Sequence, residues 1–104
     1  MDKQQLQRRY FTTYTGTGLP LKLLNELDQD SLDNRITYFV GYFDAHDRLM
    51  LIEKIVYGEI EFSHQYEYQP DNTLSKAVLI EEDEPPRTLV FDASGQAREA
   101  EAGG

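Results

Sequence analysis

Three copies of a short turn phrase constrain the fold of this chain more strongly than any other feature of its sequence. The copies begin at Phe43, Tyr68 and Phe91, at offsets of 25 residues (43 to 68) and 23 residues (68 to 91). Each reads as an aromatic residue, a polar residue, Ala or Pro, a small or polar residue, and a last residue that tolerates positive φ: Asp47, Asn72 or Gly95. This order is typical of a type I turn. Each phrase therefore predicts a three-residue hairpin loop between antiparallel strands, with a bulge after the turn.

The segments around the turn phrases have the composition of β-strands. Pro20 cannot donate a backbone hydrogen bond, which predicts that its strand lies at a sheet edge or is only partly paired. The acidic stretch 25–34 predicts a loop with at most one short helical turn near residues 28–34. Strands are expected over residues 6–15, 19–24, 36–43, 49–56, 59–68, 74–80 and 87–91. The chain is therefore predicted to be all-β, an antiparallel meander of about six to seven strands that forms a curled sheet or a partly open barrel.

Residues 59–68 show the clearest alternation in the chain. One predicted face carries apolar and aromatic side chains, and the residues between them, three of which are glutamates, form the other. The first face is expected to pack in the core and the second to meet water. The core face should consist of Ile60, Phe62, His64, Tyr66 and Tyr68.

The length of 104 residues indicates one domain that can bury a single core without a metal or a disulfide. We place this β domain at residues 1–96. Residues 97–104 contain no apolar side chain larger than alanine and are predicted to be a disordered tail.

The formal net charge of −9 comes entirely from residues 36–104, which carry fourteen acidic and five basic side chains. Such a field repels nucleic acid and anionic lipid and favours a basic protein partner, although acidity also simply keeps a small domain dissolved. The chain has no cysteine, no apolar run near the ~20 residues of a membrane span and no apolar stretch typical of a signal peptide. We therefore expect a cytoplasmic protein that binds neither nucleic acid nor membrane.

A row of carboxylates is the first candidate site. Such a row could bind a basic protein surface, or it could be solvated surface with no partner. An exposed edge strand offers a second route to a partner or to a weak dimer of an otherwise monomeric chain. The residues proposed for the acidic face are Glu59, Glu61, Glu67, Glu81 and Glu82.

A set of rings with a cation and a histidine is the second candidate, because small-molecule sites often have this composition. Ordinary cross-strand packing of tyrosines is the alternative interpretation. No serine stands in a nucleophile elbow, and His46 beside Asp44 and Asp47 lies in one tight turn, where ligands seldom converge on a metal. We therefore expect no catalytic residue, metal or cofactor. The proposed ligand-binding residues are Arg35, Tyr38, Tyr42, His64, Tyr66 and Tyr68.

Parts of the chain resemble two known groups of proteins. The phrases at Phe43-Asp44 and Phe91-Asp92 resemble the tyrosine–aspartate repeats of Rhs-type shell proteins, which implies hairpins and no catalytic residue. The runs 35–39, 56–59 and 66–68 resemble a family of small uncharacterised bacterial proteins, which implies no particular activity.

Three functional hypotheses remain open from the sequence. The favoured one is a non-enzymatic acidic β module that binds a protein partner. The second is a small-molecule binder or minor enzyme that uses the tyrosine–histidine set. The third is a modifier, because the ending Gly103-Gly104 resembles the tails of ubiquitin-like proteins.

Overall fold

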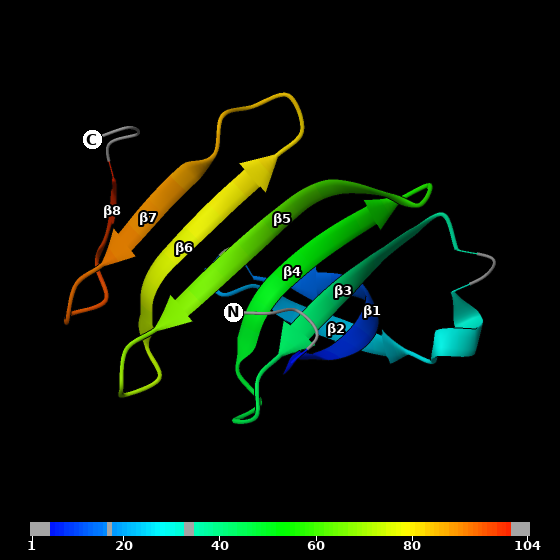
Figure 1. The fold of residues 1–104 in the computed structure, drawn as a ribbon, viewed down its shortest axis with the longest axis horizontal. Coiled ribbons are helices and arrows are strands. Elements are labelled where there is room, and N and C mark those ends of the chain that lie inside the picture. The colour runs from blue at the N-terminus through cyan, green and yellow to red at the C-terminus, as the bar shows by residue number, and fades with distance from the viewer. Residues whose placement is uncertain (1–4, 17, 33–34, 101–104) are drawn as a thin grey trace.

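The computed structural model describes residues 5–16, 18–32 and 35–100. They form one open antiparallel sheet of eight strands in the order β2-β1-β3-β4-β5-β6-β7-β8 (Figure 1). One turn of 3₁₀ helix, η2 (Gln29–Ser31), lies between β2 and β3, inside the region where the sequence predicts a short helical turn. The strands are β1 (Gln7–Thr15), β2 (Lys22–Leu27), β3 (Thr37–Phe43), β4 (Leu49–Val56), β5 (Glu59–Tyr68), β6 (Leu74–Glu81), β7 (Arg87–Phe91) and β8 (Ala97–Glu99).

The prediction of an all-β antiparallel fold is confirmed. Strands β3 to β8 follow one another as a meander, while β1 pairs with both β2 and β3, so that β2 forms an edge as Pro20 suggested. The strand count is eight because the sheet extends into Ala97–Glu99, where the sequence predicted a disordered tail. The third turn returns this segment to β7, and the Ala100 N–H donates to the Thr88 carbonyl at 2.8 Å. The rest of the predicted tail, residues 101–104, lies outside the described residues.

The three turn phrases form three loops with the same backbone geometry. In the first loop, the Asp47 N–H donates to the Asp44 carbonyl and the Asp44 N–H donates to the Arg48 carbonyl, both at 3.0 Å. The other two loops repeat both bonds from Gln69 and from Asp92. The turn-end residues have φ angles of 61°, 70° and 87° at Asp47, Asn72 and Gly95. These values confirm the prediction of a positive φ after each type I turn.

The aspartate of the phrase stabilises its loop through its side chain. Asp44 Oδ1 accepts hydrogen bonds from the N–H groups of His46 and Arg48, each at 2.9 Å. Asp92 Oδ1 does the same for Ser94 and Gln96. An aspartate in this position supplies the acceptor that the exposed loop N–H groups need.

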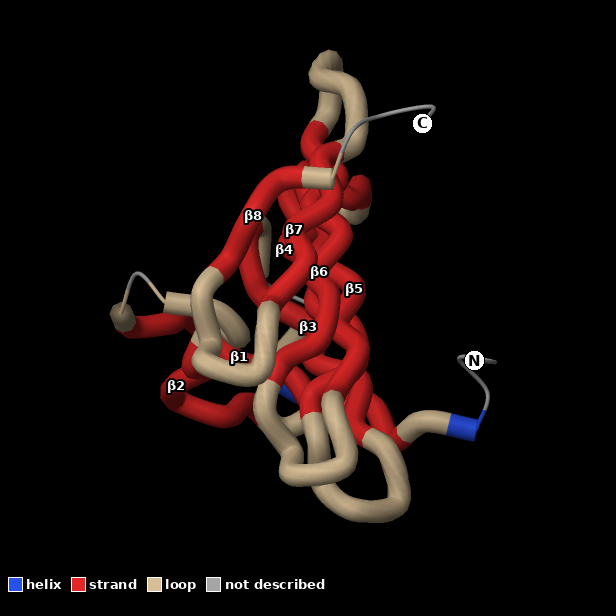
Figure 2. Tube along the Cα trace, turned by 90° about the vertical axis from the view of Figure 1, so that its left-hand side faces the viewer, coloured by secondary structure: helices blue, strands red, loops and turns tan. Residues whose placement is uncertain are grey.

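The sheet buries side chains on both faces. The inner face, over which the β1–β2 hairpin folds, carries the larger core cluster, with Phe11, Leu21, Phe39, Ile52 and Tyr66 among its buried members. In Figure 1 the hairpin crosses behind β3 and β4, and in Figure 2 it projects to one side of the sheet. The outer face carries a second cluster of Val40, Tyr42, Leu51 and Ile55. The sheet is therefore curled, with its N-terminal hairpin closing part of the inner face.

The predicted alternation along β5 holds only from Phe62 to Tyr68. The pairing of β4 with β5 shifts register between Lys54 and Ile55, so that Ile60 pairs with Ile55. Directly opposite residues of an antiparallel pair share a face, which moves Ile60 to the outer face. Ile60 is 51% exposed. The expectation that Ile60 belongs to the core face is wrong because a bulge interrupts the strand.

Candidate functional site

The six residues proposed as one ligand-binding set are divided between two faces of the sheet. Tyr38 and Tyr42 belong to the outer cluster. His64, Tyr66 and Tyr68 lie on the inner face, where Tyr66 is part of the core and Tyr68 packs against it. Arg35 lines a shallow hollow beside η2 with Ser31, Ile36 and Thr37. The six side chains therefore do not line one pocket. The two-residue period of β3 turns its tyrosines away from the face that His64 occupies.

On the outer face, Tyr42 makes a buried contact with an acidic side chain. The Tyr42 hydroxyl donates to Glu53 Oε1 at 2.7 Å, and Glu53 is 6% exposed. Burial is the main cause that raises the pKa of Tyr42 to about 12, and this hydrogen bond is the second cause. A neutral phenol bonded to a carboxylate satisfies both buried groups, which fits a structural role.

On the inner face, Tyr66 connects the hairpin to the sheet. Its hydroxyl oxygen accepts a hydrogen bond from the Leu21 N–H at 3.2 Å and lies 2.8 Å from His64 Nδ1. Burial raises the pKa of Tyr66 and lowers the pKa of His64, so the neutral forms of both groups are favoured. The Tyr66 hydroxyl thus bonds both the Leu21 N–H and the His64 ring. This chain of contacts fixes the start of β2 against β5.

The proposed acidic face is also divided. Glu61, Glu81 and Glu82 gather around one small hollow, where the Glu82 N–H donates to the Glu61 carbonyl at 3.2 Å. Glu59 pairs with Val56 beyond the bulge, whereas Glu67 lies near the other end of β5. Lys54 bonds Glu61 at 3.0 Å, and Lys76 lies 3.7 Å from Glu67. The carboxylates are therefore exposed but do not form one continuous row.

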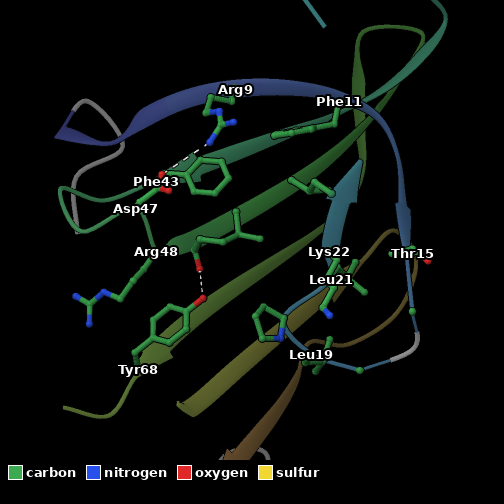
Figure 3. A pocket seen from close by; sticks show the side chains of 15 residues that line it. Arg9, Phe11, Thr15, Leu19, Leu21, Lys22, Phe43, Asp47, Arg48 and Tyr68 are labelled. Carbon is green, nitrogen blue, oxygen red and sulfur yellow. Dashed lines mark hydrogen bonds and ion pairs between the residues drawn. The ribbon is translucent and has the colours of Figure 1, made fainter. Parts of the chain in front are cut away.

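A groove that the sequence did not predict lies between the β1–β2 hairpin and the sheet (Figure 3). Its volume is about 870 Å³. Rings and leucines form its apolar surface, and of the six predicted ligand-binding residues it includes Tyr68. The Tyr68 hydroxyl donates to the Leu49 carbonyl at 2.5 Å, which fixes the ring at the groove floor. Its apolar lining consists of Phe11, Leu19, Pro20, Leu21, Leu23, Phe43, Leu49 and Tyr68.

Gly41 allows the hairpin to approach the sheet closely enough to form this groove. A Cβ atom at position 41 would lie 2.7 Å from Leu23 Cδ1 and 2.9 Å from Phe43 Cε1. Only glycine leaves room for both side chains without displacing one of them. The leucine wall of the groove therefore depends on a residue in the middle of β3.

Two arginines stand at the end of the groove where the first turn lies. The guanidinium carbon of Arg9 lies 5.0 Å from the centre of the Phe43 ring, and that of Arg48 lies 5.5 Å from the centre of the Tyr68 ring. Arg9 also bonds Glu26 at 2.5 Å and lies 3.8 Å from Asp47. The hydrogen bond with Glu26 is the main cause that raises the pKa of Arg9. Both guanidinium groups therefore lie beside apolar rings at this end of the groove.

Asp44 holds Arg48 in this position. Its carboxylate accepts from Arg48 Nε at 2.8 Å. Burial acts to raise the pKa of Asp44, but hydrogen bonds from Arg48 and His46 outweigh it and lower the pKa. The same aspartate thus stabilises the first turn and orients a cation at the groove.

Neither a metal centre nor a membrane span is evident in the part of the chain that the structure describes. No group of three or more His, Cys, Asp or Glu side chains converges there on a common point. The described residues include no helix with the length and apolar character needed to cross a bilayer.

Sequence comparison gives a family but no described activity. Neither the curated proteins nor the solved structures include a match. The comparisons add no support for the likeness to Rhs-type repeats. The feature that this chain shares with those repeats is the hairpin turn. One family model matches residues 3–100, nearly the whole chain. The protein therefore belongs to the family of unknown function DUF6156.

Proposed function

We propose that this protein acts by binding, without catalysis, and that the groove under the β1–β2 hairpin holds a small, largely apolar molecule. The observation that carries the proposal is a concave site of about 870 Å³ with an apolar lining and a few charged groups at its rim. Ligand pockets of proteins have this composition and volumes of about 300–1,000 Å³.

The state of the tyrosines supports binding rather than catalysis. Burial is the main cause that raises the pKa of Tyr68, at the groove floor, to about 12. Its phenol therefore stays protonated near neutral pH and is a poor general base. Its hydroxyl is already bonded to the Leu49 carbonyl. The side chain offers a ligand a ring surface rather than a reactive group.

Fluorescence of the neutral apolar dye Nile red tests the proposal. The dye should brighten on binding the protein, and Phe43→Leu should weaken binding because it removes a ring from the groove. Phe91→Leu is the matched control, since Phe91 occupies the same place in the third turn phrase and packs on the core outside the groove lining. Absence of brightening, or equal weakening by both variants, would contradict a ligand site in this groove.

A protein partner is the second candidate, supported by an exposed apolar patch at the tip of the β4–β5 hairpin. Tyr57 is 77% exposed, Ile36 53% and Ile60 51%. The Tyr57 N–H donates to the Ile36 carbonyl at 2.8 Å, so the two residues lie side by side. Exposed aromatic and aliphatic residues of this kind often dominate protein interfaces, and neighbouring Glu59 would favour a basic rim on the partner.

Capture of a partner with variant proteins tests this second candidate. Tyr57→Ser should abolish recovery of a specific partner, whereas Tyr14→Ser, at another exposed tyrosine, should leave recovery unchanged. Equal recovery by both variants would exclude the hairpin tip as the interface. The modifier hypothesis depends on Gly103-Gly104, which lie outside the described residues.

A further inference from the structure

We infer that the groove selects a free, single-chain amphipathic molecule with a carboxylate head group, which binds at the Arg9 and Arg48 end. The inference rests on the proposed function and specifies its ligand. The apolar chain of the molecule would lie over Phe43 and Leu49 toward the leucines of the hairpin. Figure 3 shows Arg9, Asp47 and Arg48 at one end of the groove, and Leu19, Leu21 and Lys22 at the other.

Arg9 has donor groups left for an anion. Its Nε and Nη2 atoms bond Glu26 at 3.2 Å and 2.5 Å. Its Nη1 atom lies 3.8 Å from Asp47 Oδ1, which is within ion-pair range but beyond hydrogen-bond range. A guanidinium carries five N–H donors, so a ligand carboxylate could take the Nη1 donors without displacing Glu26.

Arg48 adds positive charge at the same end. Its Nε donates to Asp44, and its Nη1 donates to Asn72 Oδ1 at 3.4 Å. Within the described residues its Nη2 makes no hydrogen bond. The Asp44 side chain is 9% exposed and the Arg48 side chain 29%, so the cation is the more accessible member of the pair.

The charge of the groove lining is opposite to that of the chain. The lining contains Arg9, Lys22, Arg48 and one carboxylate, Asp47, a formal charge of +2 (three minus one), whereas the whole chain carries −9. Lys22 forms no ion pair with any residue that the structure describes. Because Lys22 lies at the leucine end, Arg9 and Arg48 are the cations that match an anionic head attached to an apolar chain.

Asp47 competes with such a head group, because its 79% exposed side chain is the carboxylate that faces Arg9 Nη1. This position gives a gain-of-binding variant. Asp47→Asn removes the charge and keeps a residue that tolerates the φ of 61°. The matched control is Asp83→Asn, because Asp83 is also exposed, also has a positive φ of 66°, and lies in the β6–β7 turn outside the groove lining.

Displacement of bound Nile red by three ten-carbon probes tests the head-group preference. The probes are decanoate, decanol and decyltrimethylammonium, each at low ionic strength and below its aggregation concentration. Decanoate should displace the dye at about three- to fivefold lower concentration than decanol, the size expected of a solvent-exposed ion pair. Decyltrimethylammonium should be the weakest, and added salt should reduce the advantage of decanoate.

Asp47→Asn should increase the difference in affinity between decanoate and decanol. Asp47→Asn should tighten decanoate binding about twofold or more and leave decanol unchanged, and Asp83→Asn should change neither. Equal displacement by all three probes, stronger displacement by the cation, or no gain from Asp47→Asn would overturn the carboxylate preference while leaving the groove as a ligand site.

Two further outcomes distinguish a failure of the ligand assignment from a failure of the proposed function. If Nile red itself fails to bind, the proposed function and this inference both fall. If the protein sediments with phosphatidylglycerol vesicles but decanoate has no advantage over decanol, the anionic groups belong to a membrane surface and a free carboxylate ligand is excluded.

Discussion

At the scale of single residues, Asp47 combines two opposing effects. Its φ of 61° lies in the left-handed region, which disfavours a side chain with a Cβ atom. Its carboxylate pairs with Arg9 at 3.8 Å, but this exposed pair contributes little to folding. The backbone term should therefore dominate the effect of a substitution on stability.

We predict that Asp47→Gly raises the free energy of unfolding by up to roughly 1 kcal/mol, because glycine adopts positive φ without the Cβ penalty. Asp47→Ala should lower it, since alanine tolerates a positive φ less well than aspartate does. Urea unfolding should rank the free energies of unfolding as glycine variant, then parent, then alanine variant, from highest to lowest. A glycine variant less stable than the parent would contradict this interpretation of the turn.

Tyr66→Phe should be more damaging than its small change in size suggests. It leaves the Leu21 N–H and His64 Nδ1 without the hydroxyl that now joins them. A buried polar group left without a partner costs about 1–3 kcal/mol. Tyr10→Phe is the control, because the described contact of Tyr10 is a ring contact with Tyr38. Equal losses of stability from the two substitutions would exclude a role for the Tyr66 hydroxyl.

The same contact predicts a pH dependence. Burial lowers the pKa of His64 from its ordinary 6.5, so the unfolded chain binds a proton more readily than the folded one. The contribution of His64 to the free energy of unfolding is therefore complete above about pH 6.5. It is lost as the pH falls toward the folded-state pKa of His64. Unfolding measured between pH 7.5 and 5 should show this decline, and His64→Phe should reduce it, whereas exposed His46→Gln should not. If the decline in stability is unchanged in His64→Phe, groups other than His64 cause it.

At the scale of elements, the turns were predictable and the bulge was not. Residue types alone determine the φ of Asp47, Asn72 and Gly95, because few residues tolerate that conformation. The register shift between Lys54 and Ile55 leaves no comparable mark in the sequence, so Ile60 was assigned to the wrong face. β8 was missed because pairing with β7, rather than its own composition, orders it.

Gly41→Ala should weaken the docking of the hairpin on the sheet. The new methyl group would lie 2.7 Å from Leu23 Cδ1, and the side-chain ends must move to accept it. Overpacking of this kind costs typically about 1–3 kcal/mol. Gly18→Ala is the control, since a Cβ atom there meets nothing within 4 Å and its φ is not positive. Equal unfolding midpoints of the two variants in urea would show that the hairpin is loosely held.

At the scale of the whole molecule, the groove arises because the sheet is curled and the β1–β2 hairpin folds over its inner face. The alternation of Leu19, Leu21 and Leu23 was evident in the sequence, and Tyr68 was among the predicted ligand-binding residues. Nothing in the sequence indicated that the first hairpin would fold over the inner face and bring Arg9 beside Phe43. Contacts between distant strands depend on twist and closure of the sheet, which residue types specify only weakly.

Amide chemical-shift mapping with decanoate is the sharpest test of the groove as a ligand site, because it locates the ligand without any substitution. We predict saturable shifts that are largest around the groove at Arg9, Phe11, Phe43 and Leu49 and small at Val78 and Val90, which lie on β6 and β7 and outside the groove lining. Saturable shifts confined to β6 and β7, or none at all, would contradict the groove as the binding site of this protein.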